Sequence, residues 1–258
     1  MRRFTDERGI AHIVEIVIIA VVLLGVAGFI GWRVLDANQN KPNAAQQAIA
    51  NAECKKINDQ DVCKFLTGWK QNTSYKVTST QTVAGESSTS IFSATNNGAN
   101  YHMQMTINGQ PYEVIGIGNV LYTKDSADGK WWKQTIEPGK EADYKAGNNY
   151  TFEDPNTASD TPAAQEPQYK KIGVEACGDK TCFKYQIIDP SAADTTQFIW
   201  FDNKDYQLRR MTSTFKDSTS DQTFAYEKIA INAPSPTKDL PAGSYIVPGQ
   251  SEPLSVPQ

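Results

Sequence analysis

The chain has 258 residues, a formal net charge of -4 and 21% charged residues. This length suits one substantial domain with attached segments. Because the chain is mildly acidic, it has no excess of basic residues to attract a phosphate backbone, and nucleic acid is not an expected partner.

The first element is an apolar segment from Ile10 to Trp32. As a helix, at about 1.5 Å per residue, it is long enough to cross a hydrocarbon core of about 30 Å. Arginines precede it, which favours a cytoplasmic N-terminus. We therefore expect a cytoplasmic N-terminus at 1–9, a transmembrane anchor helix at 10–35 and a linker at 36–43, with the main domain in the periplasm or at the cell surface.

Two alternatives to an uncleaved anchor stay open for this segment. A cleaved signal peptide has a shorter apolar core and a small-residue cleavage site, and no convincing site follows here. A type IV pilin carries Glu at the fifth position after its glycine cleavage site, whereas Glu15 is the sixth residue after Gly9. The apolar segment also carries a stripe of small residues, which offers a contact to a membrane-protein partner. It consists of Gly25, Gly28 and Gly31.

The four cysteines form two close pairs, Cys54 with Cys63 and Cys177 with Cys182. An even number of locally paired cysteines beyond a membrane segment predicts two disulfides in an oxidising compartment. A zinc site is the alternative, but the usual CxxC spacing is missing and no histidine lies near either pair.

Two helices are expected at the start of the main domain. Ala44 to Lys56 is rich in alanine and glutamine, which favours a helix. A second, short helix is predicted by apolar residues at helical spacing: Val62, Phe65, Leu66 and Trp69. Either Asp59 or Asp61 can cap its N-terminus.

After residue 72 the apolar residues alternate with the period of two that is typical of strands. The turn sequences Asn108-Gly109, Gly118-Asn119 and Asp128-Gly129 predict hairpins between them. About ten strands are expected, and the eleven segments that show the pattern are Tyr75–Val83, Ser88–Thr95, Tyr101–Ile107, Tyr112–Ile117, Val120–Lys124, Trp131–Lys133, Lys171–Ala176, Phe183–Ile188, Gln197–Phe201, Leu208–Phe215 and Gln222–Ile231. Since they are consecutive, the sheet should be antiparallel. Residues 234–258 contain six prolines and predict an extended, disordered tail, which leaves 44–233 as the domain.

Two stretches carry a resemblance to a known family. The first runs from Tyr101 to Lys124 and continues through the Asp128-Gly-Lys-Trp-Trp-Lys133 motif; the second comprises Phe198 to Met211 and Phe224 to Pro234. Their order of strands and tight turns resembles the LolA/LppX group of periplasmic lipoprotein carriers and lipid-binding lipoproteins, over roughly residues 72 to 234.

The resemblance implies a mainly β (α+β) fold in which a strongly curved antiparallel sheet forms an incomplete barrel with covering helices. It also implies an apolar hollow that holds an acyl chain or a lipidated partner. This sequence departs from the group in its membrane anchor, its two local disulfides and its proline-rich tail. The anchor favours holding a ligand at one membrane surface over shuttling it.

No pattern in the sequence predicts an enzyme, a metal site or a cofactor. Of the two histidines, His12 lies in the membrane segment and His102 lies alone on a strand, facing away from Tyr101. No nucleophile elbow, metalloprotease, P-loop or dinucleotide motif is present. Residues 125–129 resemble a calcium loop only superficially and are expected to form a hairpin turn.

The sequence therefore predicts a membrane-anchored binding protein for a lipid or lipidated ligand, with no covalent chemistry. The alternatives are a structural surface protein, either a pilin-like subunit or an adhesin, and a sensor ectodomain that acts on a membrane partner. The candidate cavity residues are Tyr101, Met103, Met105, Ile107, Tyr112, Val114, Tyr122, Trp132, Trp200, Phe215, Phe224 and Tyr226.

Overall fold

The chain divides into two compact units, residues 1–41 and 42–258. The computed structural model describes parts of the second unit, namely residues 54, 59–67, 74–95, 99–107, 109–136, 168–241, 244–245 and 254–255. Within these residues, no helix is long and apolar enough to cross a membrane. The expected anchor at 10–35 and most of the helix expected at Ala44 to Lys56 lie outside them.

The short helix predicted from apolar spacing is α3, Gln60–Thr67. Val62 is completely buried, and Phe65 and Leu66 are nearly so. Asp59 caps the helix, because its Oδ1 accepts hydrogen bonds from the backbone N–H groups of Asp61 and Val62 at 2.9 and 3.1 Å. The expected helix and its cap are thus confirmed for Gln60–Thr67, and Trp69 lies outside the described residues.

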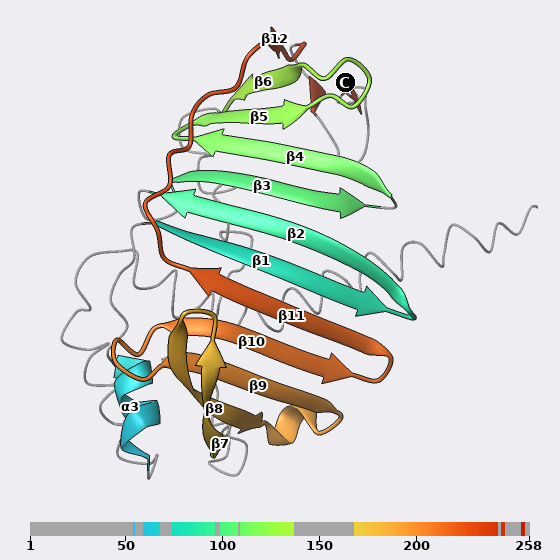
Figure 1. Ribbon diagram of the computed structural model, residues 1–258. Coiled ribbons are helices and arrows are strands. Elements are labelled where there is room, and N and C mark those ends of the chain that lie inside the picture. The colour runs from blue at the N-terminus through green and yellow to red at the C-terminus, as the bar shows by residue number, and fades with distance from the viewer. Residues whose placement is uncertain are drawn as a thin grey trace, which may run out of the picture. The chain divides into compact units, whose positions relative to one another are not determined.

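Twelve strands form one sheet, in the order β12-β6-β5-β4-β3-β2-β1-β11-β10-β9-β8-β7 (Figure 1). Their bounds are β1 Ser74–Val83, β2 Glu86–Thr95, β3 Asn100–Ile107, β4 Gln110–Ile117, β5 Val120–Lys124, β6 Trp131–Thr135, β7 Gln168–Cys177, β8 Lys180–Ile188, β9 Thr195–Asp202, β10 Leu208–Phe215, β11 Ser218–Ala225 and β12 Thr237–Asp239. The strand expected at Gln222–Ile231 begins and ends earlier, because the Lys216-Asp217 turn pairs β11 tightly with β10.

Eleven of the twelve strands belong to two meanders, β1 to β6 and β7 to β11. Within each meander, strands that follow one another in the chain are paired. The meanders join where β1 pairs with β11, in an antiparallel ladder that runs from Lys76 opposite Ala225 to Val83 opposite Ser218. Figure 1 shows this junction in the middle of the sheet.

The C-terminal segment differs from the disordered tail that its prolines predict. Thr237–Asp239 form β12, which pairs in parallel with β6, so the sheet is mixed and not purely antiparallel. Further along, β13 (Ser244–Tyr245) pairs with β14 (Leu254–Ser255). Residues 237–239 are three consecutive residues that are not prolines, so each has a backbone N–H group. These three residues suffice for pairing along the open edge of β6.

The sheet is open, and β12 and β7 are its edge strands. It is mainly β, as expected, but it is not closed or strongly curled (Figure 1). Apart from a 3-10 turn at Pro190–Ala192, α3 is the helical element in the described part of the chain. The several covering helices that would impose strong curvature are therefore not found among the described residues.

The two faces of the sheet are distinguished by α3. The ring of Phe65 stacks on that of Phe201, with centroids 4.6 Å apart, and the Tyr185 hydroxyl donates to Asp59 Oδ2 at 2.8 Å. We call the face on which α3 packs the inner face and the opposite one the outer face. Ile199 and Leu208 complete the buried core at this end.

Both predicted disulfides are present. Cys54 is joined to Cys63 in α3, and Cys177 is joined to Cys182 across the tip of the β7–β8 hairpin. The described residues contain no free cysteine, and the two bridges fit an extracytoplasmic location.

Candidate functional site

An apolar surface extends over the inner face across the first four strands. Val77 lies opposite Phe92, Phe92 opposite Met103, and Met103 opposite Val114. Directly paired residues point to the same face of a sheet. This surface, here called the apolar row, consists of Tyr75, Val77, Phe92, Ala94, Tyr101, Met103, Met105, Tyr112 and Val114.

Aromatic rings follow one another along the apolar row. The ring of Phe92 lies 6.0 Å from that of Tyr75 and 6.1 Å from that of Tyr101, between centroids. The Tyr101 ring lies flat across Gly116, its direct partner on β4. A Cβ atom at Gly116 would stand 2.2 Å from Cε1 of Tyr101. Only glycine lets the ring lie this close to the strand.

The phenol groups of the apolar row are shielded from water. Burial raises the pKa of Tyr75 to about 12. Burial, together with the nearby Tyr101, raises the pKa of Tyr112 to about 12 as well. The pKa of Tyr101 is raised by burial too. Because desolvation disfavours the phenolate, all three side chains behave as neutral, largely apolar groups.

The cavity residues predicted from the sequence do not all lie on one face of the sheet. Eight of them lie on the inner face, and six of these are Tyr101, Met103, Met105, Tyr112 and Val114 in the apolar row and Phe224 opposite Val77. Phe215 and Trp132 also belong to that face, but Phe215 is 39% exposed at the end of β10. Tyr122 and Trp200 point to the outer face, Tyr226 follows β11, and the side chain of Ile107 is outside the described residues.

Several inner-face residues were missing from the sequence-based candidates. Tyr75, Phe92 and Ala94 lie in serine- and threonine-rich strands whose alternation is weak. Five buried polar residues of the same face were missed with them: Ser79, Gln81, Ser213, Ser220 and Gln222. The signal that could have found them is their spacing, since Ser79 and Gln81, like Ser220 and Gln222, stand two apart on one strand.

The outer face has a pocket of about 700 Å³ beneath the tip of the β7–β8 hairpin. Its floor includes Trp200, which is only 3% exposed. Arg210 donates two hydrogen bonds to Asp221, at 2.9 and 2.6 Å, and its guanidinium carbon lies 4.9 Å from the Trp200 ring. Arg209, also in the lining, pairs with Asp205 at 2.7 Å. These ion pairs make the pocket polar, and it does not suit an acyl chain.

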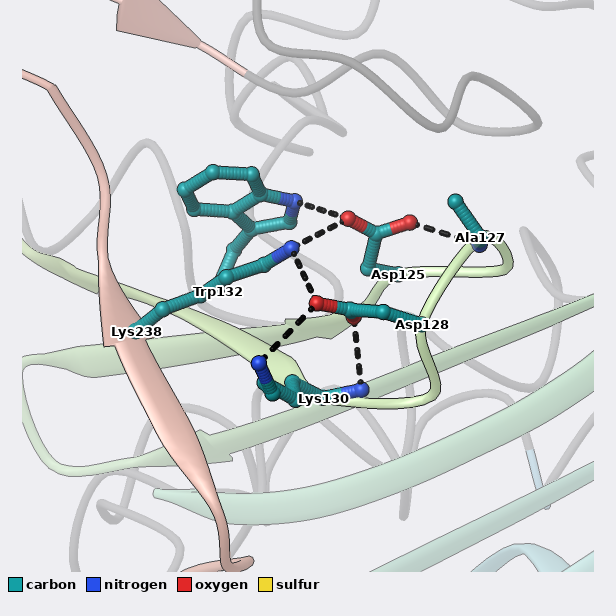
Figure 2. Close-up of polar contacts among 6 residues, drawn as sticks. All are labelled: Asp125, Ala127, Asp128, Lys130, Trp132 and Lys238. Atoms are coloured by element: carbon teal, nitrogen blue, oxygen red, sulfur yellow. Dashed lines mark hydrogen bonds and ion pairs between the residues drawn. The ribbon is translucent and has the colours of Figure 1, made fainter.

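The turn at residues 125–130 holds β12 against β6 (Figure 2). Lys238 Nζ lies 2.5 Å from Asp125 Oδ2 and 3.1 Å from Asp128 Oδ2, and it stands 4.0 Å from the centroid of the Trp132 ring. The indole N–H of Trp132 donates to Asp125 at 3.1 Å. Burial acts to raise the pKa of Asp125, but the hydrogen bonds from Lys238 and from the Ala127 N–H, together with the positive charge of Lys238, outweigh it, and the pKa is lowered. This is a hairpin turn, as the sequence predicts.

The described residues contain no cluster of metal ligands, and the one histidine among them lies in a network of ion pairs. No group of three or more His, Cys, Asp and Glu residues there could hold a metal ion. His102 points to the outer face, as expected, and its Nε2 lies 2.8 Å from Glu113 Oε1. Glu113 also accepts hydrogen bonds from Lys124 and Gln104, at 2.8 and 3.0 Å. This network pairs charges on the solvent side of the sheet.

Comparison with known proteins finds likeness in structure and none in sequence. No family model matches the chain, and no curated protein matches it. Among solved structures, the lipoprotein LppX of Mycobacterium tuberculosis is 13% identical, with 67% of this chain and 96% of that one covered, at a TM-score of 0.44. LprF from Mycobacterium bovis is 14% identical, with 76% and 99% covered, at 0.42.

A LolA superfamily protein from Nitrosomonas europaea is also similar, at 8% identity and a TM-score of 0.22, with 59% of this chain and 83% of that one covered. The structures found thus include the group that the sequence resembles. At such identities the likeness concerns the fold alone.

Proposed function

We propose that this chain is a membrane-anchored binding protein whose domain outside the cytoplasm holds a lipid or lipidated ligand on the inner face, without covalent chemistry. The observation that carries the proposal is the apolar row, which presents aligned aromatic and methionine side chains across four neighbouring strands. The anchor is the segment from Ile10 to Trp32, and the two disulfides suit a domain in an oxidising compartment.

The chemistry of the apolar row suits an acyl chain. Each methylene group moved from water onto an apolar surface contributes about 0.8 kcal/mol. Met103 and Met105 provide flexible, polarisable contacts that adapt to chains of different shape. Phe92 and the Tyr101 ring, which lies flat over Gly116, provide smooth surfaces along which a chain can lie. The neutral phenols add no charge that would repel it.

The test is mass spectrometry of organic extracts from the purified domain, residues 42–258, made in an oxidising compartment. A stoichiometric co-purified lipid is the expected result. Met103→Asp should lose the lipid, since it places a carboxylate in the apolar row. Thr106→Asp is the matched control on the exposed, outer face of the same strand and should retain it.

A stable domain that never carries lipid, whatever membrane extract it is exposed to, would overturn the proposal. The structural surface protein or the sensor ectodomain would then become the working function.

A further inference from the structure

Five buried, uncharged polar side chains form a patch beside the apolar row. Ser79 lies opposite Gln222, Gln81 opposite Ser220, and Ser220 opposite Ser213. The register therefore places all of them on the inner face, across β1, β11 and β10. We call this patch the serine–glutamine belt: Ser79, Gln81, Ser213, Ser220 and Gln222.

Three atoms of the belt lack a hydrogen-bond partner in the described part of the chain: Ser79 Oγ, Gln81 Nε2 and Ser220 Oγ. Their side chains are nonetheless buried, since the residues are 5%, 6% and 3% exposed. A buried polar group without a partner loses its bonds to water and gains nothing in return, which destabilises the fold. Apolar residues, like Val77 earlier on the same strand, would be more stable here, so folding does not explain the belt.

The belt and the apolar row are neighbouring halves of one surface. On β1, Tyr75 and Val77 belong to the apolar row, and Ser79 and Gln81 follow two and four residues later. The residues directly opposite the belt are also uncharged: Ser88, Ser90, Gln197 and Met211. The part of the inner face that carries the belt and the apolar row is therefore amphiphilic without being charged.

We propose that the belt binds the uncharged hydrogen-bonding part of the lipid, a hydroxyl, ester or amide group, while the acyl chain lies on the apolar row. This rests on the proposed function and names its ligand class. Hydroxyl and amide side chains donate and accept hydrogen bonds, so Ser79, Gln81 and Ser220 can satisfy such a group from two neighbouring strands.

A phosphate or carboxylate head group does not match the belt. Proteins bind such anions with arginine, lysine or clustered backbone N–H groups, and the belt offers no cation. Moving an anion onto a buried surface without a counter-charge is strongly unfavourable. Arg210, the nearest arginine in register on β10, points to the outer face and is already paired with Asp221.

The experiment uses the full chain reconstituted in nanodiscs and three photoreactive probes that share one diazirine-bearing acyl chain. The probes are a monoacylglycerol, the matching hydrocarbon and the matching lysophosphatidic acid, and crosslinked peptides are identified by mass spectrometry. We expect the monoacylglycerol to label the inner-face strands at about tenfold lower concentration than the hydrocarbon. The lysophosphatidic acid should label no better than the hydrocarbon.

The double variant Gln81→Leu/Ser220→Ala removes the polar groups of two belt residues that lie directly opposite each other on β1 and β11. It should label equally with monoacylglycerol and hydrocarbon, and its Tm should rise because unpaired buried groups are gone. Thr80→Val is the matched control, since Thr80 lies between Ser79 and Gln81 but is exposed on the outer face, and it should keep the preference.

Each outcome separates the two proposals. If no probe labels the inner face, the proposed function falls and the ligand class falls with it. If all three probes label equally, or lysophosphatidic acid labels best, lipid binding stands and the role of the belt is overturned. A preference for monoacylglycerol that survives in the double variant also overturns it.

Discussion

The two faces of the sheet use their polar residues in opposite ways. On the outer face, charges are matched: Glu113 is surrounded by His102, Lys124 and Gln104, and Arg210 is paired with Asp221. On the inner face, the polar groups of the belt are uncharged, buried and in part unmatched. Stability and solubility account for the first arrangement and not for the second. Binding is the function that an inner face of this kind suits.

The largest expected effect comes from placing a charge on the inner face. Val114 is 4% exposed in the middle of β4. Val114→Asp would bury a carboxylate without a partner and should lower the free energy of unfolding by about 3–5 kcal/mol. Thr106→Asp, on the exposed outer face of β3, should change it by less than about 0.5 kcal/mol. Urea denaturation of both variants measures the difference, and equal effects would contradict the contrast between the faces.

The next effect concerns the close approach of Tyr101 to β4. Gly116→Ala would place a methyl group inside the Tyr101 ring and should cost about 1–3 kcal/mol through the displacement of that ring. It should also reduce lipid retention. Gly173→Ala is the control, because a Cβ there meets nothing within 4 Å. Thermal unfolding of the two variants tests this, and a Gly116→Ala protein as stable as the wild type would show that the ring moves away freely.

A smaller effect is expected at the β12 edge, where charge pairing has a purely structural role. Lys238→Met removes the partner of Asp125 and Asp128 and should destabilise the domain by about 2 kcal/mol. Hydrogen exchange should then increase at Trp131, whose N–H donates to the carbonyl of Pro236 at 3.0 Å. Lys130→Met removes only an exposed ion pair and should leave that exchange rate unchanged.

The smallest effect is electrostatic: it is absent at neutral pH and appears only in alkaline solution. Tyr75 and Tyr112 have a folded-state pKa of about 12, above the value of about 10 for an unfolded chain. Between pH 10 and pH 12 these tyrosines are deprotonated in the unfolded chain but still protonated in the folded protein. The free energy of unfolding is therefore unaffected below about pH 10 and falls as the pH rises towards 12. Ultraviolet titration of tyrosinate should show both groups ionising late, and Tyr75→Phe should remove one late step.

Local elements were predictable from the sequence, and their assembly was not. The alternation of apolar and polar residues over Tyr101–Ile107 predicted β3 to within one residue, because each residue's environment in a half-buried strand repeats every second position. The pairing of β1 with β11 has no local signal, since it joins residues from opposite ends of the domain. β12 was missed because prolines surround its three residues.

The candidate site was predicted in part for the same reason. Alternation assigns faces only relative to other residues of one strand, so Tyr101 and Met103 were grouped correctly. Whether Trp200 or Tyr122 shares their face depends on the register between strands, which places both on the other side. Ser79 and Gln81 resemble solvent-facing residues in sequence, and only their burial in the folded sheet distinguishes them.

The junction of β1 with β11 has a consequence for the order in which the protein is made. Two residues of the belt, Ser79 and Gln81, lie on the first strand of the domain, and the other three, Ser213, Ser220 and Gln222, lie on the last two strands of the second meander. A growing chain reaches these three only when nearly the whole domain has been synthesised and exported. Under the proposed function, a ligand that contacts both β1 and β11 could therefore bind only after β11 has paired with β1, and chains truncated before β11 would not hold it.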